Sequence, residues 1–204
     1  MANTNKTDAR LNLYIRFLKE RLFFEPNSAT LHYNLGLAYN QNGLVEEAIS
    51  ELKQALECEP NLPPAHVNLG GLYLRKGMVE EAVQANLRAL ELDPDFIPAH
   101  SNLGLAYLQA GDLDKAIEHG AKALQLSPGS AQAYSILFAA LLQAGQTNEA
   151  AELSRNMIEQ NNDFAPAHYN LGLALEALGR TDEAQEEFGK AGQMGYPPQS
   201  DEQS

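Results

Sequence analysis

The sequence predicts an all-α protein built as a solenoid of tandem helical hairpins. A short cassette, with His at its second position and Asn-Leu-Gly at its end, occurs at residues 31–36, 65–70, 99–104 and 167–172. The final glycines are separated by 34 residues, or by twice that interval, without any insertion. A fixed period of this length indicates a repeat array, in which each unit packs mainly against its neighbours.

Helical spacing and turn signals divide each repeat into two helices. In the second repeat, apolar residues from Val67 to Leu74 recur at helical spacing. Every first helix is followed by a glycine that suits a left-handed helix end, namely Gly43, Gly77, Gly111, Gly145 and Gly179. Acidic residues such as Glu80 and Glu81 come shortly afterwards, where they oppose the positive end of the next helix dipole. We therefore assign these carboxylates to helix initiation and not to catalysis.

The period also defines the expected domain organisation. Residues 1–7 are expected to be disordered, and residues 8–26 to form an N-terminal capping helix, a half-repeat with Asp8 at its N-cap. Residues 199–204 are expected to form a disordered tail. Between them lie five repeats, at residues 29–62, 63–96, 97–130, 131–164 and 165–198.

The two ends of the array leave alternatives open. The apolar arc of the capping helix covers more than half of its circumference, so one neighbouring helix cannot bury all of it. Either this helix caps the array with some aromatic surface exposed, or the surface contacts a second copy or a membrane; capping of solenoid ends is expected. After Phe188 no additional helix follows, so the C-terminal end is either an exposed surface or one covered by the tail.

The charge distribution limits the classes of partner. The formal net charge is −13, and residues 1–26 carry five cations against three acids, a local charge of +2. The remaining 178 residues therefore carry −15. Such a body repels phosphate backbones, so we expect no nucleic-acid partner and favour neutral, basic or hydrophobic protein ligands.

Cysteine usage and hydropathy bear on the compartment. Cys58 is the single cysteine, so an intrachain disulfide is impossible, which fits a reducing compartment. The first ten residues are polar and lack the apolar core of a signal peptide. No apolar run approaches the roughly 18 residues that a membrane span needs. These features predict a cytoplasmic protein without a membrane span.

The landmarks of the repeats resemble those of the tetratricopeptide-repeat (TPR) family, whose 34-residue helix–turn–helix unit carries Leu-Gly, Tyr, Ala, Phe and Pro. The second repeat matches at Leu69, Gly70, Tyr73, Ala82, Ala89 and Pro94. The third repeat matches at Leu103, Gly104, Tyr107, Ala116, Ala123 and Pro128. The resemblance covers residues 29–198 and implies a right-handed superhelical α-solenoid of tandem hairpins.

The fourth repeat departs from this pattern. It has Phe138 in place of the cassette glycine, Leu141 in place of the tyrosine and Asn162 in place of the proline. The aromatic landmark of the second helix is present only as Phe188. The third repeat has Gly120 at that position, and we expect Phe138 to fill the space that Gly120 leaves.

The resemblance implies a binding surface. In this family, the first helices of successive repeats line a concave groove that takes a peptide or helix of another protein. Transferred position by position, the implied peptide-binding residues are Tyr33, Asn34, Leu37, Asn40, Asn68, Leu74, Arg75, Asn102, Leu105, Leu108, Gln109, Tyr169, Asn170 and Leu173. The leucines among them favour a hydrophobic peptide or an amphipathic helix.

Four asparagines of this set, Asn34, Asn68, Asn102 and Asn170, share one register of the repeat. They resemble the asparagine ladder in the repeat region of the O-linked N-acetylglucosamine transferases, which implies pairing with the backbone of an extended peptide. A side-chain amide both donates and accepts, so it suits this role. The alternative is that these amides hydrogen-bond neighbouring helices within the array.

Four of the five histidines also share one register, as His32, His66, His100 and His168. Packed helices lie roughly 8–10 Å apart, too far for one shared coordination shell, so we expect packing roles and no metal site. No phosphate-binding loop, paired-cysteine site or nucleophile motif occurs. The sequence therefore predicts a non-catalytic interaction scaffold or adaptor without a cofactor. The alternative is a structural protein that self-associates, as a homo-oligomer, through the N-terminal helix or the C-terminal end.

Overall fold

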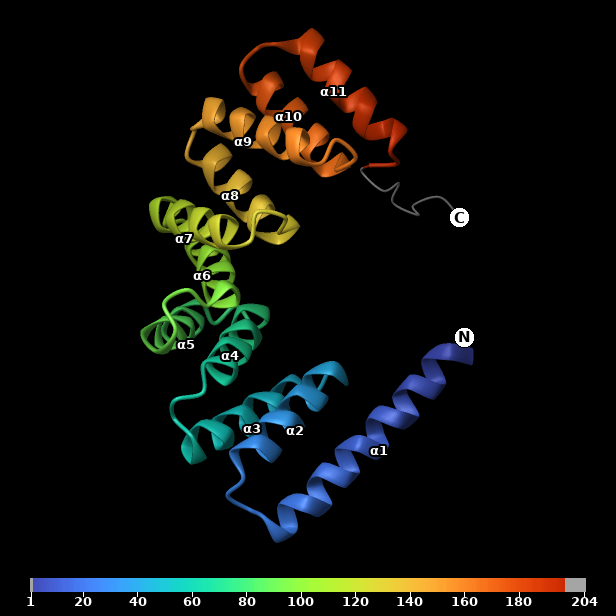
Figure 1. Cartoon of the computed structure of the whole chain (residues 1–204), viewed down its shortest axis with the longest axis vertical. Coiled ribbons are helices and arrows are strands. Elements are labelled where there is room, and N and C mark those ends of the chain that lie inside the picture. Colours follow the sequence, from blue (N-terminus) through green and yellow to red (C-terminus); the bar gives the residue numbers. More distant parts are fainter. Residues whose placement is uncertain (1, 197–204) are drawn as a thin grey trace. The chain divides into compact units, whose positions relative to one another are not determined.

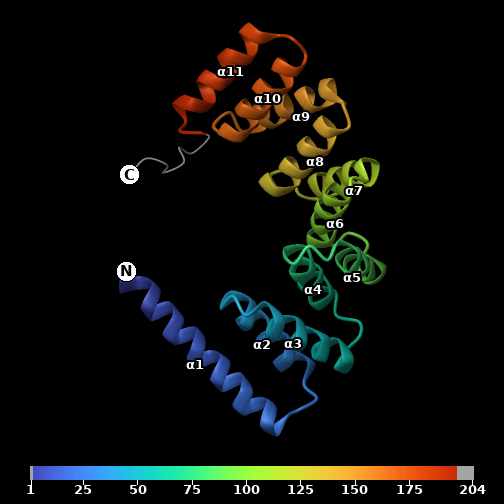
Figure 2. The same cartoon turned by 180° about the vertical axis from the view of Figure 1, so that it is seen from behind.

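The structure is a computed structural model that describes residues 2–196, with side chains from residue 9 onward. The chain divides into two compact units, Met1–Ala110 and Gly111–Ser204. Every regular element among the described residues is an α-helix, as Figure 1 and the reverse view in Figure 2 show. The predicted all-α class is therefore confirmed. Within this described part, no helix has the length and apolar character needed to cross a membrane.

The helices follow one another in pairs. The first unit contains α1 (Ala2–Phe24), α2 (Ala29–Gln41), α3 (Val45–Cys58), α4 (Pro63–Arg75), α5 (Val79–Leu92) and α6 (Ile97–Ala110). The second unit contains α7 (Leu113–Leu126), α8 (Ala131–Gln143), α9 (Thr147–Gln160), α10 (Ala165–Ala177) and α11 (Thr181–Gln193). From α2 onward, two helices fall within the bounds of each expected repeat. The tail expected at residues 199–204 lies outside the described residues.

The turn inside each hairpin depends on a left-handed backbone. Gly43 has a φ of 76°, and the N–H of Leu44 donates to the carbonyl oxygen of Tyr39 at 2.9 Å. This bond closes the end of α2 in a Schellman arrangement. The four equivalent glycines have φ values between 72° and 79°. A side chain with a Cβ adopts this conformation only at a cost, which confirms the expected role of these glycines.

The two helices of a hairpin approach each other closely at the cassette glycine. A Cβ added to Gly36 would lie 2.9 Å from Cγ of Leu52. A Cβ added to Gly172 would lie 2.5 Å from a ring carbon of Phe188. In both hairpins, the contacted residue comes 16 positions after the glycine. The glycine therefore fixes both the distance and the register between the two helices.

Phe138 replaces the cassette glycine in the fourth repeat. Its ring stacks on Tyr134, with ring centroids 6.2 Å apart. The 16-residue register sets Phe138 opposite Ser154, so a large residue on α8 meets a small one on α9. The atoms nearest to Gly120 belong to Leu137, because α7 packs there against the backbone of α8. The expectation that Phe138 fills this space is therefore wrong, because Leu137 lies there instead.

The N-terminal helix is longer than expected. It begins at Ala2 instead of Asp8, so Asp8 is not its N-cap, and residues 2–7 are helical and not disordered. The segment before Asp8 contains no glycine or proline that would stop a helix. Ile15 and Leu18 of α1 pack on α2, which buries one side of the helix.

The C-terminal end of the array is partly covered by the residue that follows α11. Gly195 has a φ of 77°, and the N–H of Tyr196 donates to the carbonyl oxygen of Ala191 at 2.9 Å. This turn sets the ring of Tyr196 edge-on to Tyr169 of α10, with centroids 5.5 Å apart. The ring of Phe188 lies 5.4 Å from the same tyrosine. The two alternatives stated for this end concern the tail at residues 199–204, which lies outside the described residues.

We expect the variant Gly172→Ala to lose about 1–3 kcal/mol of unfolding free energy, because the new Cβ overlaps the ring of Phe188. The matched variant Gly189→Ala adds the same methyl group on α11 where no atom lies within 4 Å. It should gain about 0.5–1 kcal/mol, since alanine favours a helix over glycine. Urea unfolding followed by circular dichroism measures both changes. Equal effects at the two sites would contradict the close-approach account.

Candidate functional site

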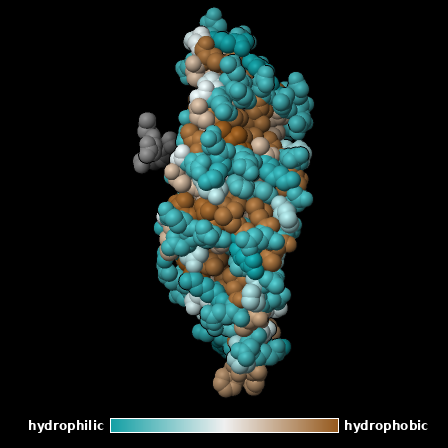
Figure 3. Space-filling model, turned by 90° about the vertical axis from the view of Figure 1, so that its left-hand side faces the viewer, coloured by the Kyte–Doolittle hydropathy of each residue, from teal (hydrophilic) through white to brown (hydrophobic). Residues whose placement is uncertain are grey.

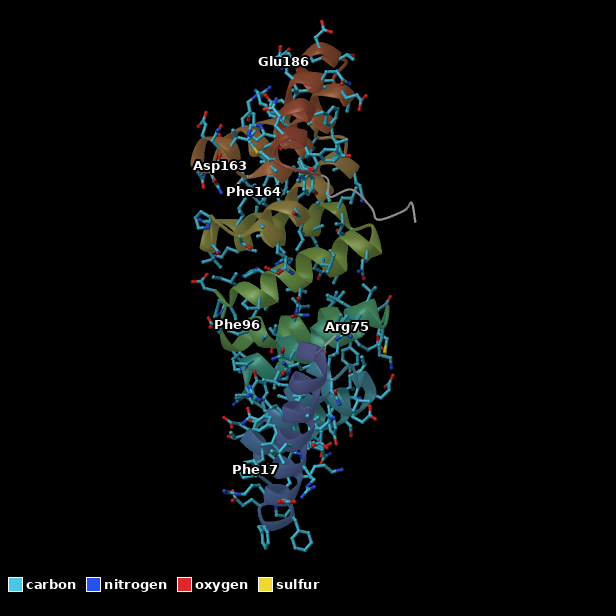
Figure 4. The ribbon with its side chains drawn as sticks, turned by 90° about the vertical axis from the view of Figure 1, so that its right-hand side faces the viewer. Phe17, Arg75, Phe96, Asp163, Phe164 and Glu186 are labelled. Atoms are coloured by element: carbon cyan, nitrogen blue, oxygen red, sulfur yellow. The ribbon has the colours of Figure 1, made fainter. Side chains whose placement is uncertain are left out.

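The candidate groove residues lie on the first helices of the repeats. In the first unit they come from α2, α4 and α6, and in the second unit from α10. Arg75, labelled in Figure 4, is exposed and donates to Oδ1 of Asn40, which links α4 to α2. Gln109 is also exposed. The half-buried residues are Tyr33, Asn34, Leu37, Asn40, Asn68, Asn102, Leu105, Leu108, Tyr169, Asn170 and Leu173.

Leu74 differs from the other groove residues because it is not accessible. Its side chain is only 8% exposed and belongs to a hydrophobic cluster with Leu72 of α4 and Ala106 of α6. Since α4 packs on α3, α5 and α6, it buries a wider arc than a helix with one neighbour. We therefore assign Leu74 to the core and remove it from the groove.

The amide of Asn68 connects α4 to α2. Its Nδ2 donates to the hydroxyl oxygen of Tyr33 at 3.1 Å and to the backbone carbonyl of Pro64 at 2.8 Å. Both amide hydrogens are therefore used within the array. Burial raises the pKa of Tyr33, and the hydrogen bond with Asn68 offsets only part of this rise, so the phenol is protonated at neutral pH.

Asn102 connects α6 to both helices of the preceding hairpin. Its Nδ2 donates to the carbonyl oxygen of Val67 at 3.2 Å and to Oδ1 of Asn86 at 3.1 Å. Asn86 is fully buried, and its own Nδ2 donates to the carbonyl of Ala82 at 2.7 Å. Gly70 makes room for this amide, since a Cβ there would lie 2.1 Å from Nδ2 of Asn86. The buried amide is thus held by two hydrogen bonds within its own unit.

The same row continues in the second unit. Asn170 of α10 hydrogen-bonds Tyr134 of α8, whose hydroxyl also lies 2.9 Å from Oγ of Ser154. Burial raises the pKa of Tyr134, and the hydrogen bonds with Ser154 and Asn170 offset part of this rise. Asn34 begins the row, and its side chain forms no hydrogen bond with any residue that the structure describes.

The nitrogen and oxygen atoms of these side-chain amides differ in their hydrogen bonds. The Nδ2 hydrogens of Asn68 and Asn102 bond within the array, whereas no described residue donates to the Oδ1 atom of either. Asn68 and Asn102 therefore offer acceptors and not donors. The sequence analysis treated each amide as both a donor and an acceptor, and it missed Asn86 as a hydrogen-bond partner of this row. A polar residue 16 positions after a cassette glycine was the available signal.

The histidine row has a structural explanation. In four repeats, Nε2 lies 2.8–3.0 Å from a carbonyl oxygen six residues earlier, in the pairs His32–Pro26, His66–Pro60, His100–Pro94 and His168–Asn162. A carbonyl only accepts, so each Nε2 carries a proton. These bonds tie each first helix to the segment before it. Among the described residues, no group of three or more potential metal ligands is found.

Four cavities on the described residues lie away from the candidate groove residues. One of 480 Å³ runs along α1, and three of 340–550 Å³ lie beside the second helices of hairpins. These four cavities are lined by residues outside the candidate set.

Family models support the repeat assignment. A model described as TPR repeat matches residues 38–77 and 72–111, and models described as tetratricopeptide repeat match residues 97–130 and 141–194. This chain belongs to the tetratricopeptide-repeat family. The fold is a protein-interaction scaffold, which is the general class of function that the sequence predicts. Among curated proteins, none matches this chain.

Solved structures share the fold. The crystal structure of the MamA protein is 26% identical, covers 86% of this chain and 96% of its own, and has a TM-score of 0.74. YrrB, described as a TPR protein with an unusual peptide-binding site, is 21% identical, covers 89% and 93%, and has a TM-score of 0.74. MamA 41-end from Desulfovibrio magneticus RS-1 is 23% identical, covers 84% and 97%, and has a TM-score of 0.75. The likeness establishes an all-α TPR solenoid.

We expect Asn102→Ala to destabilise the array more than Asn68→Ala. The first change strips the donor from the buried oxygen of Asn86, and an unsatisfied buried acceptor costs about 1–3 kcal/mol. The second leaves Tyr33 and Pro64, which are half-buried and accessible to water, so the loss should be about 0.5–1.5 kcal/mol. Urea unfolding compares the two. A larger loss at Asn68 would contradict this ranking.

Proposed function

We propose that this protein is a non-catalytic adaptor that binds an extended peptide of a partner protein along α2, α4 and α6. The observation that carries the proposal is the pair of Oδ1 atoms on Asn68 and Asn102 that no described residue occupies. Packed helices lie about 8–10 Å apart and an extended chain advances about 3.3 Å per residue. Successive oxygens therefore suit backbone N–H groups about three residues apart.

The surroundings of these oxygens define the chemistry of the peptide. Leu37, Leu105 and Leu108 are half-buried beside the asparagine row on the same helices, which favours apolar side chains in the ligand. The formal charge of −15 outside residues 1–26 favours a neutral or basic peptide over an acidic one. A partner segment with apolar and basic residues in alternation meets both conditions.

Peptide binding is stated for YrrB, whose fold this chain shares. At 21% identity the likeness concerns the fold, so the proposal rests on the residues of this chain. The repeats proposed to carry the first helices are those at residues 29–62, 63–96, 97–130, 131–164 and 165–198, and the α10 residues Tyr169, Asn170 and Leu173 are proposed as peptide contacts of the second unit by itself.

Selection from a random-peptide display library, followed by isothermal titration of the selected peptide, tests the proposal. The double variant Asn68→Ala/Asn102→Ala should bind at least about tenfold more weakly, because it removes two acceptors of about 0.5–1.5 kcal/mol each. The matched control Tyr33→Phe removes only the hydroxyl that accepts from Asn68, and it keeps both the Oδ1 of Asn68 and the aromatic ring that Tyr33 contributes to the candidate groove. It should change affinity by no more than about twofold.

Two results would assign the asparagines to bracing alone. The first is a library that yields no peptide with saturable binding. The second is a Tyr33→Phe variant that loses as much affinity as the double variant. Circular dichroism of each variant shows whether a loss of binding follows from a loss of helix.

Self-association is a second candidate function, and the exposed face of α1 favours it. Leu13 is 65% exposed and Phe17, labelled in Figure 4, is 51% exposed. Phe23 and Phe24 are more exposed still. Contiguous exposed apolar residues mark interaction surfaces. Arginines such as Arg10 line the 480 Å³ cavity that runs along α1. Their positive charge is complementary to the net negative charge that a second copy carries outside residues 1–26.

Sedimentation equilibrium tests this candidate. If α1 mediates self-association, the wild-type protein should show a concentration-dependent mass and Phe17→Glu should shift it to the monomer, because a charge then replaces an aromatic contact. The control Lys19→Gln changes the net charge by the same amount at an exposed position on the polar side of α1 and should leave the mass unchanged. A wild-type protein that is monomeric at every concentration rules the candidate out.

A further inference from the structure

Glu187 shows how this array holds a carboxylate. On α11, its Oε2 accepts from Nδ1 of His168 and its Oε1 accepts from Nζ of Lys190, both at 2.6 Å. Burial raises the pKa of this carboxyl, but the hydrogen bonds from Lys190 and His168 outweigh it and hold the pKa below the ordinary 4.5. The carboxylate therefore has two donors, one from each helix of the hairpin.

The first repeat contains the same histidine–carboxylate pair. Nδ1 of His32 lies 2.7 Å from Oε2 of Glu51, and both side chains are largely buried. In both hairpins the acid comes 19 positions after the histidine. The backbone of the repeat thus places a carboxylate that comes 19 residues after the cassette histidine within hydrogen-bond distance of the imidazole ring of that histidine.

The second repeat has the donors without the acid. The repeat positions of His168 and Lys190 are occupied in the second repeat by His66 and Arg88. The position of Glu187 is occupied there by Ala85. Nε2 of His66 donates to the carbonyl oxygen of Pro60 at 2.8 Å, and its Nδ1 has no hydrogen-bond partner among the described residues. Arg88 is exposed and bonds only Glu91 and Asn61, which are weak surface contacts.

A cavity occupies the place of the missing side chain. It measures 450 Å³ and is lined by His66, Ala85 and Arg88, together with Leu56, Leu69 and Tyr73. Residues two apart on a helix are separated by about 200°, so His66 and Asn68 lie on different sides of α4. Figure 3 shows the side of the molecule on which α5 lies in Figure 1, and hydrophobic patches alternate there with hydrophilic surface. The cavity is therefore separate from the proposed groove.

We propose that this cavity is a second docking site, in which a glutamate or aspartate side chain of a partner protein takes the place that Glu51 and Glu187 occupy in their own repeats. In its imidazolium form, His66 donates from Nδ1 while Nε2 keeps its bond to Pro60, and Arg88 donates from its guanidinium group, as His168 and Lys190 do for Glu187. The apolar walls receive the residues that flank the acid in the partner. A charged hydrogen bond inside such a cavity is stronger than one in open water.

Acidic neighbours do not prevent this binding. Glu80 and Glu81 also line the cavity. The equivalent residues of the first repeat are Glu46 and Glu47, and Glu51 forms its bond with the histidine in their presence. The geometry therefore accepts a carboxylate at this position beside two others.

The variant Ala85→Glu tests the geometry within the chain. Its carboxylate should bond Nδ1 of His66, and an adjacent negative charge stabilises the imidazolium form. An NMR titration of the imidazole signals should then show the titration midpoint of His66 about one pH unit higher than in Ala85→Gln, which has similar volume but no charge. The signals of the other histidines serve as internal references. Identical His66 midpoints in the two variants overturn the proposal.

A peptide probe tests the docking itself. The probe is N-acetyl-Leu-Glu-Leu-amide, compared with its glutamine analogue, and the readout is the His66 imidazole signal of the full chain. We expect a saturable shift with the glutamate peptide, at least about tenfold weaker binding of the analogue, and loss of binding in Ala85→Glu. The proposal is overturned by the absence of a saturable shift, by equal binding of the two peptides, or by unchanged binding in Ala85→Glu.

Discussion

The close approach of two helices at the cassette glycine is the contact on which the rest of the array depends. At Gly36 and at Gly172, the side chain 16 positions later occupies the space that a Cβ would need. Because that offset is the same in both hairpins, the contact fixes the rotation of the second helix as well as its distance. The buried face, the exposed face and the position of every polar residue follow from this register.

One consequence concerns the side chain that fills the space. Leu52 and Phe188 fill it with apolar groups, whereas Asn86 fills it with an amide. A buried amide needs partners, and Asn102 supplies a donor from the next repeat. The nitrogen atoms of Asn68 and Asn102 therefore hold the array together, and their oxygen atoms accept no hydrogen bond from any described residue.

A second consequence is that equivalent positions can differ in chemistry while the backbone stays the same. His32 and His168 meet a glutamate across the hairpin, whereas His66 meets Ala85. Both ring nitrogens of His32 and His168 face acceptors, but only Nε2 of His66 does. The difference between repeats, more than the repeat itself, gives each hairpin a surface of its own.

The sequence by itself determined the fold class, the repeat period, the turn glycines and the shared register of the asparagines, because each depends on local spacing along the chain. The tertiary structure decided what these residues do. It buried Leu74, since α4 has neighbours on several sides, and it extended α1 to Ala2. It also assigned the amide hydrogens of Asn102 to Val67 and Asn86. Such partners lie in other helices, and no periodicity within one helix specifies which of two polar atoms faces them.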